Sequence, residues 1–176
     1  MTFKRIMKKI ATLLFGICFF GLQATHNRAG EITYRWLNGF TYEVTITTYT
    51  RACELCADRC DLTINWGDGS NDVLLRNNGN NTRCLTGRDG VIIDQVNRIR
   101  KNTYVGTHTY PAAGSYIIFM EDRNRNAGIS NIINSDQVPF YIASELFISP
   151  SLGPNSSPIL TNPPVERGCK DKRFEH

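Results

Sequence analysis

Two short motifs contain the residue types on which catalysis most often depends. The first, at 65–70, reads NWGDGS and carries the carboxylate of Asp68, and the second, at 106–116, reads GTHTYPAAGSY and carries the imidazole of His108. A carboxylate and an imidazole can act as general acid and base, and both can bind a metal ion. Either role needs further partners near each residue.

Asp68 stands between Gly67 and Gly69, a spacing that is typical of a tight turn. Glycine supplies positive φ, and an Asp side chain accepts hydrogen bonds from backbone N–H groups two residues on. One carboxylate alone is a poor acid–base pair, and the stretch lacks the spacing of an EF-hand calcium loop. We therefore expect Asp68 to stabilise a turn.

His108 lies in the alternating stretch THTY, with no Cys or Ser nucleophile within sequence reach. The other two histidines, His26 and His176, are too few and too distant to complete a histidine metal site. No G-x-S-x-G, H-E-x-x-H or phosphate-binding glycine loop occurs. The sequence thus indicates no enzyme and no required cofactor, and we expect His108 to pack beside Tyr110 and to hydrogen-bond a turn.

The cysteines allow a second kind of chemistry. Beyond the N-terminal Cys18 there are five: Cys53, Cys56, Cys60, Cys84 and Cys169. Their spacing could supply four thiolates to zinc, and C-x2-C could be a redox pair. Thiols of an exported protein oxidise, so we favour disulfides. We expect one bridge between the 53–60 loop and Cys84, with the choice of loop cysteine left open, and at least one cysteine without an intrachain partner.

Export is indicated by residues 1–24, which are predicted to be a signal peptide. Four basic residues precede an apolar run, and the segment ends at Ala24. The run is shorter than the roughly 20 residues that a membrane-spanning helix needs. We expect cleavage after Ala24, no membrane span in the remainder, and a secreted or cell-surface location.

The charge of the remaining chain excludes one class of partner. The whole sequence has 20 Lys and Arg and 16 Asp and Glu, but four of the basic residues and none of the acidic ones lie in 1–24. The rest therefore has 16 of each and a formal net charge of zero. Nucleic-acid binding would need a basic patch on the folded domain, so we expect none.

Apolar residues alternate with polar ones in several short stretches, as in half-buried strands. The first two are centred on Ile32 to Trp36 and Tyr42 to Ile46, and Asn38-Gly39 between them predicts a type I′ hairpin. Further strands are expected at 62–66, 73–76, 91–94, 104–108, 115–121 and 138–149. Residues 95–103 are only weakly patterned, and the alternation in 138–149 shifts phase near Ala143-Ser144. No sustained helical period occurs, so we expect an all-β sandwich.

This organisation predicts one domain over residues 25–149. The proline-rich stretch that follows reads PSLGPNSSPILTNPPV, which is typical of an extended linker. We expect residues 150–176 to be this linker and the start of a second domain that is truncated here. Cys169 would then pair outside the chain.

The two motifs together resemble the signature of PKD domains, which are Ig-like β-sandwiches repeated in secreted and cell-surface proteins. The matching residues are Trp66, Gly67, Asp68, Gly69, Ser70, His108, Tyr110, Gly114 and Tyr116. The spacing between the motifs is longer than is usual in that family, which suggests an insertion at 76–100. The resemblance implies an Ig-like antiparallel sandwich and a structural role for these residues.

A wider resemblance covers most of the chain after residue 24. The stretches ATHNRAGEITYRW, THTYPAAGSYIIFMEDRNRNAGI, VPFYI and LGPNSSPILTNPP are similar to the N-terminal domain of gliding-motility-associated surface proteins. In that family further adhesive repeats and a sorting domain linked to type IX secretion follow. The resemblance implies an adhesive or spacing role, with other domains of the same protein as partners.

Two binding roles remain as alternatives. A carbohydrate-binding module would need an exposed aromatic platform, for which the candidates are Tyr34, Trp36, Phe40, Tyr49 and Tyr104, although alternation places most of them in the core. The stretch DRNRN at 122–126 could bind calcium only weakly through Asp122. We expect recognition of glycans or surface proteins, if present, on the loops at 71–90 and 122–137.

Overall fold

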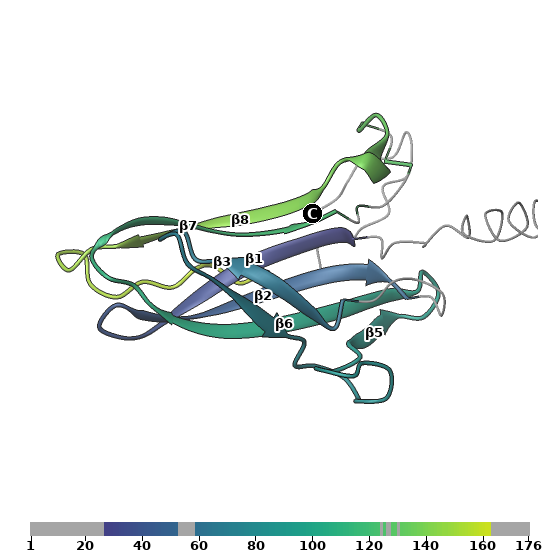
Figure 1. The fold of residues 1–176 in the computed structure, drawn as a ribbon, viewed down its shortest axis with the longest axis horizontal. Helices are drawn as coiled ribbons and strands as arrows, with labels where there is room; N and C mark the ends of the chain where they lie inside the picture. Colours follow the sequence, from purple (N-terminus) through teal and green to yellow (C-terminus); the bar gives the residue numbers. More distant parts are fainter. Residues whose placement is uncertain (1–26, 53–58, 124, 126–127, 130, 163–176) are drawn as a thin grey trace, which may run out of the picture.

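The computed structural model describes residues 27–52, 59–123, 125, 128–129 and 131–162. The predicted signal peptide and three of the cysteines (Cys53, Cys56 and Cys169) lie outside these residues. Within them the chain forms two four-stranded antiparallel sheets packed face to face, which confirms the predicted all-β, Ig-like class of sandwich (Figure 1). No helix in the described ranges is long and apolar enough to cross a membrane.

Each sheet combines strands from both halves of the chain. Sheet A has the order β1 (Asn27–Asn38), β2 (Thr41–Arg51), β6 (Ile99–Thr109), β5 (Val91–Asp94). Sheet B has the order β4 (Asn71–Leu75), β3 (Asp61–Asn65), β7 (Gly114–Asp122), β8 (Phe140–Ile148). A single 3₁₀ turn, η1 (Ser135–Gln137), interrupts the loop before β8.

The core follows from the period-two alternation. On β2 the side chains of Tyr42, Val44 and Ile46 point between the sheets, and they meet Ile64 and Ile118 from sheet B. Val44, Ile46, Ile64 and Ile118 are all 0% exposed. Burial of a side chain of this size stabilises a fold by about 1.5–3 kcal/mol, so this layer accounts for much of the stability.

Three local expectations were wrong. β6 begins at Ile99 within the stretch that looked unpatterned, because its inward residues there, Arg100 and Asn102, are polar yet buried. β8 keeps one phase throughout, with Phe140, Leu146 and Ile148 buried and no irregularity in its pairing with β7. The first hairpin turns at Gly39-Phe40, where Gly39 alone has positive φ, so it is not the type I′ turn expected at Asn38-Gly39.

The proline-rich segment does not leave the domain directly. Ser157 N–H donates to the carbonyl oxygen of Tyr34 at 3.0 Å, and the Tyr34 N–H donates to Ser157 Oγ at 2.8 Å. Asn155 accepts a hydrogen bond from the Tyr42 hydroxyl and donates one to the Phe147 carbonyl. The first part of the predicted linker therefore covers the outer edge of β1, which would otherwise present unpaired backbone groups.

Candidate functional site

The turn after β3 brings the first motif together. Gly67 and Gly69 have φ of +87° and +94°, and Trp66 N–H donates to the Ser70 carbonyl at 3.1 Å. Asp68 Oδ1 accepts from the Ser70 N–H at 2.9 Å and from its hydroxyl at 2.6 Å. A Cβ on Gly67 would lie 2.6 Å from the Ile117 carbonyl oxygen, so only glycine fits there. Asp68 thus closes a turn, as its spacing predicted.

The second motif packs directly on this turn. His108 Nε2 lies 2.7 Å from Asp68 Oδ2, and its ring stacks on Trp66 with centroids 4.7 Å apart. The Tyr110 ring lies perpendicular to that of His108, with centroids 4.8 Å apart, and its hydroxyl donates to the Trp66 carbonyl. Tyr116, two residues after Gly114 begins β7, packs on Tyr110 at 4.3 Å. We call these residues (Trp66, Asp68, Ser70, His108, Tyr110 and Tyr116) the Trp66 cluster.

The geometry of the Trp66 cluster suits a structural link between the sheets. The Ser70 hydroxyl donates to Asp68 and does not approach the imidazole, so no nucleophile is paired with a base. The side chains of His108 and Asp68 are only 17% and 11% exposed. Burial raises the pKa of Tyr110 well above its usual range, so its hydroxyl stays a hydrogen-bond donor.

The ionisation of Asp68 makes the stability pH-dependent. Burial opposes its charged form, but the hydrogen bonds from Ser70 and His108 outweigh burial and lower its pKa to about 2. Since the unfolded pKa is about 3.9, Asp68 stabilises the fold above pH ~4, and this contribution is lost as the pH falls towards 2. We expect the free energy of unfolding to fall by about 2 kcal/mol more in the wild type than in Asp68→Asn over that range.

Urea denaturation followed by circular dichroism at pH 5, 4, 3 and 2 measures this difference. Asp136→Asn is the matched control, because Asp136 is exposed and lies outside the Trp66 cluster. For this variant, the free energy of unfolding is expected to depend on pH as it does in the wild type. Equal slopes for the wild type and Asp68→Asn would contradict the role of the Asp68–His108 pair.

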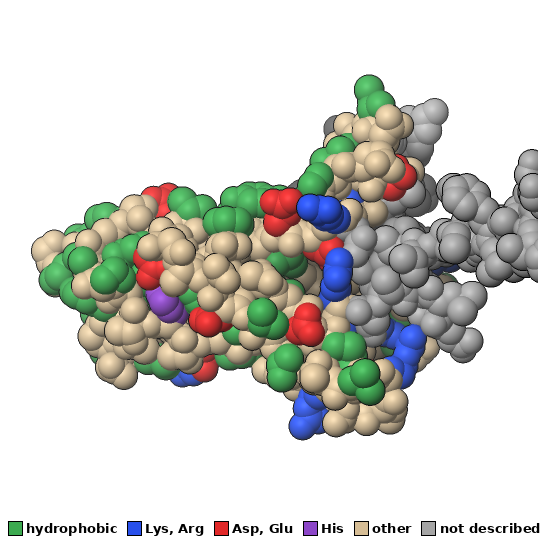
Figure 2. All heavy atoms as spheres, viewed as in Figure 1, with side chains coloured by type: hydrophobic (Ala, Val, Ile, Leu, Met, Phe, Trp, Pro, Cys, Tyr) green, Lys and Arg blue, Asp and Glu red, His purple; other side chains and the backbone are tan. Residues whose placement is uncertain are grey.

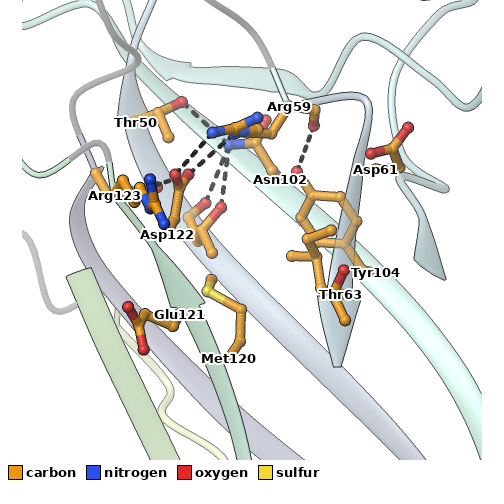
Figure 3. Close-up of a pocket in the computed structure, with 13 residues that line it drawn as sticks. Thr50, Arg59, Asp61, Thr63, Asn102, Tyr104, Met120, Glu121, Asp122 and Arg123 are labelled. Carbon is orange, nitrogen blue, oxygen red and sulfur yellow. Dashed lines mark hydrogen bonds and ion pairs between the residues drawn. The ribbon is translucent and has the colours of Figure 1, made fainter. Parts of the chain in front are cut away.

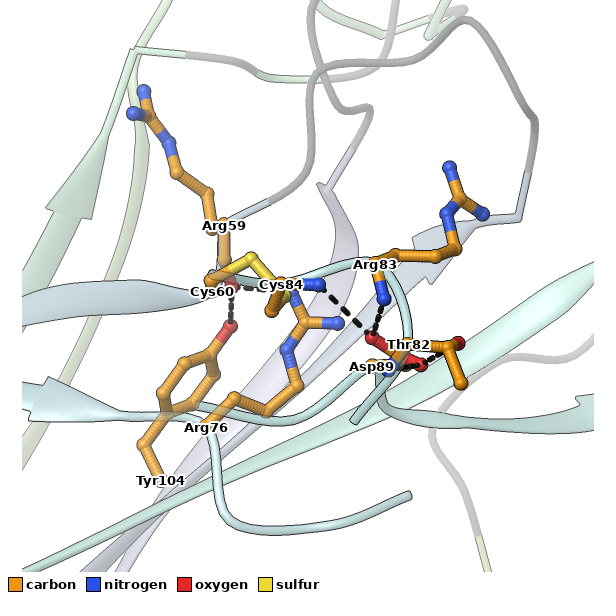
Figure 4. Close-up of a disulfide and its surroundings, with 8 residues drawn as sticks. All are labelled: Arg59, Cys60, Arg76, Thr82, Arg83, Cys84, Asp89 and Tyr104. Carbon is orange, nitrogen blue, oxygen red and sulfur yellow. Dashed lines mark hydrogen bonds between the residues drawn. A yellow bond between two sulfur atoms is a disulfide. The ribbon is translucent and has the colours of Figure 1, made fainter. Parts of the chain in front are cut away.

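A disulfide joins Cys60 to Cys84, so among the loop cysteines Cys60 is the one bonded to Cys84 (Figure 4). Beside it the buried guanidinium of Arg76 and the hydroxyl of Tyr104 both donate to the Arg59 carbonyl. The Asp89 carboxylate accepts from the Thr82 side chain and from backbone N–H groups at 82–84, which hold its pKa well below its usual range. The bridge and this carboxylate together order the long polar insertion.

The aromatic candidates do not form one platform. Tyr49 and Tyr104 are buried, at 2% and 1% exposure, and Tyr34 is half-buried. Trp36 is 38% exposed and lines a shallow groove of about 230 Å³ with Phe40. Pro150 and Pro154 lie on the other side of this groove, which we call the Trp36 groove.

Sheet B is split at the opposite end of the sandwich. β3 and β7 pair only at Asn65 and Phe119, and beyond this pair the two strands diverge. A pocket of about 280 Å³ lies between them (Figure 3). We call it the β3–β7 gap. The buried side chains of Thr48, Thr50 and Asn102 from sheet A form its base.

Asp122, which the sequence offered as a weak calcium ligand, lies at the mouth of the β3–β7 gap. Its carboxylate accepts from Arg59 Nη2 at 3.1 Å and Nε at 3.3 Å, and from Asn27 Nδ2 at 2.9 Å. The ion pair with Arg59 therefore crosses from one lip of the gap to the other. Among the described residues, no three His, Cys, Asp or Glu side chains are grouped as metal ligands.

The β3–β7 gap is not evident from the sequence, because the pattern of one strand does not show where it parts from its neighbour. One signal was available: the inward phase of Tyr42, Val44 and Ile46 continues into the polar Thr48 and Thr50. An inward position that turns polar marks a place where the two sheets stop enclosing an apolar core.

Comparison of the chain with protein-family models, curated proteins and solved structures gave no match.

Proposed function

We propose that the chain is a non-enzymatic, exported module that spaces or presents adhesive parts of a larger cell-surface protein. The observation that carries this proposal is the Trp66 cluster, in which the residues best suited to chemistry are bonded to one another across the two sheets. Such a cluster stiffens a sandwich. The resemblance to PKD domains and to gliding-motility-associated surface proteins supplies the surface context and the type IX secretion route.

The strand pairing supports a mechanical role. β2 is paired along its length with β1 on one side and β6 on the other, so extension of sheet A would have to break long antiparallel ladders. The disulfide limits how far the insertion at 76–100 can extend. These features suit a spacer that transmits force between neighbouring domains.

Surface exposure on the source cells tests this proposal. Antibodies raised against the purified domain are expected to label intact cells, and brief proteinase K treatment of those cells should remove the signal. An antibody against a cytoplasmic protein is the control for lysis. Labelling that appears only after the cells are broken would contradict the surface role.

A carbohydrate-binding module is the second candidate. The Trp36 groove favours it, because an exposed indole beside a second aromatic ring can pack on the apolar face of a sugar. The Trp36 Nε1–H already donates to the Gly39 carbonyl at 3.0 Å, which fixes the ring but removes its polar atom from recognition. The spacer role therefore ranks first.

A further inference from the structure

The β3–β7 gap contains polar side chains that the fold does not use. Four such residues line it: Asp61 and Thr63 on β3, and Glu121 and Arg123 on the β7 side. Their side chains make no hydrogen bond or ion pair within the described part of the chain. They belong to strands on opposite sides of the gap and lie at its rim, with the carboxylates of Asp61 and Glu121 turned away from each other (Figure 3). A pocket with apolar walls and a few polar groups around it is the usual form of a ligand site.

The charges around the gap favour a neutral ligand. Arg59 and Arg123 line it together with three carboxylates, those of Asp61, Glu121 and Asp122, of which Asp122 is paired with Arg59. On the face shown in Figure 2, most Lys and Arg side chains likewise gather towards the β5 end of the sandwich, with acidic side chains among them. The carboxylates would repel an anion, and the guanidinium groups would repel a cation. A neutral molecule with many hydroxyl groups can donate hydrogen bonds to the carboxylates and accept them from the guanidinium groups.

The remaining walls define the size and the apolar side of that molecule. Leu62, Tyr104 and Met120 supply apolar surface inside the gap. The volume of about 280 Å³ lies just below the usual range of ligand pockets, about 300 to 1,000 Å³, so the gap suits a small ligand. We propose that the β3–β7 gap binds a single sugar ring of a glycan, with its hydroxyl groups on the polar lip and its C–H face on Leu62 and Met120.

An extended peptide fits the same space less well. A peptide strand added to a sheet needs an open edge along which its backbone can pair. The gap is closed at one end by the Asn65–Phe119 pair and crossed at its mouth by the Arg59–Asp122 ion pair. This inference assigns carbohydrate binding, the second candidate function, to the β3–β7 gap and not to the Trp36 groove. The spacer role does not depend on it.

Titration of the isotopically labelled protein with methyl glycosides of glucose, galactose, mannose and N-acetylglucosamine tests the inference. With at least one glycoside, NMR shifts are expected at Thr50, at the Asn102 side-chain amide and at residues 61–63 and 121–123. Concentrations up to about 50 mM would nearly fill even a site with a Kd of about 1 mM. Glu121→Gln and Arg123→Gln are each expected to weaken binding about fivefold, the effect of one lost hydrogen bond.

Trp36→Ala is the matched control and is expected to leave the affinity unchanged. Shifts that cluster around Trp36 and vanish in that variant would place binding in the Trp36 groove and overturn the inference. The absence of shifts at the gap with all four glycosides would overturn it as well. So would binding of tri-alanine there without binding of any glycoside. None of these results alters the expected surface labelling, so the two proposals fail separately.

Discussion

Replacing Trp66 with alanine is expected to lower the free energy of unfolding by about 3–5 kcal/mol, which is the usual cost of removing a buried aromatic ring. Trp66 is 0% exposed, and its Nε1–H donates to Asp72 Oδ2 at 2.8 Å. The substitution removes the ring on which His108 stacks, and it leaves a cavity between β3 and β6. Since a domain of this size is stable by only about 5–15 kcal/mol, much of its stability depends on this side chain.

Trp36→Ala is the matched control for this substitution, because it removes the same side chain from the surface. Trp36 is 38% exposed, and we expect its loss to cost less than about 1 kcal/mol. Urea denaturation followed by circular dichroism compares the two variants. If Trp66→Ala shows no folded baseline, Trp66→Phe, which keeps a ring but loses the bond to Asp72, should give an intermediate stability. Equal costs for Trp66→Ala and Trp36→Ala would show that the Trp66 cluster does not hold the sandwich together.

The Trp66 cluster also shows what the sequence could predict and why. Asp68 between two glycines has one favourable local conformation, so its turn was predictable from residue chemistry alone. The placement of His108 beside Tyr110 followed from the alternation of β6, continued one residue past its end at Thr109. The stacking of His108 on Trp66 was not predictable in this way, because it depends on how the end of β3 lies against β6 from the other sheet.

The point at which β3 and β7 part was beyond the reach of local patterns for a related reason. β3 and β7 each read as ordinary strands, and nothing within either sequence indicates that their pairing stops at Asn65–Phe119. The divergence is a property of how two strands, separated by a long insertion, are held in one sheet. Patterns of period two determine which face is buried, but they do not determine how far two strands stay together.

β3 and β4 are consequently the least firmly attached part of sheet B. They pair with each other along their whole length, but they meet the rest of the sheet at one residue pair. Two other attachments compensate: Trp66 at the end of β3, and the Cys60–Cys84 disulfide at its start. The loop that carries Cys84 is itself bound to β6, since Asn77 N–H donates to the Thr103 carbonyl and Asn78 bonds the backbone at 101 and 103. The bridge therefore ties the lip of the gap to sheet A.

Removal of this bridge is expected to lower the free energy of unfolding by about 3.5 kcal/mol. The two cysteines are 24 residues apart, and the loop-entropy relation gives about this value for a loop of that length. Cys60→Ser combined with Cys84→Ser tests it by urea denaturation. The pair Cys53→Ser and Cys56→Ser is the matched control and should keep the wild-type stability. A loss confined to the control pair would show that Cys84 bonds a different loop cysteine.

The loss of stability without the disulfide should also be uneven across the fold, because the most weakly attached strands open first. Without the bridge, the start of β3 keeps its pairing with β4 and the contacts of Arg59 with Tyr104, Arg76 and Asp122. Since β2 is paired on both sides, amide hydrogen exchange at 61–64 should accelerate more than exchange at 44–46 in the centre of sheet A. Hydrogen exchange of the wild type and the Cys60→Ser, Cys84→Ser variant measures this difference directly. Uniform acceleration in both strands would mean that the disulfide acts only on the unfolded chain and does not hold β3 in place.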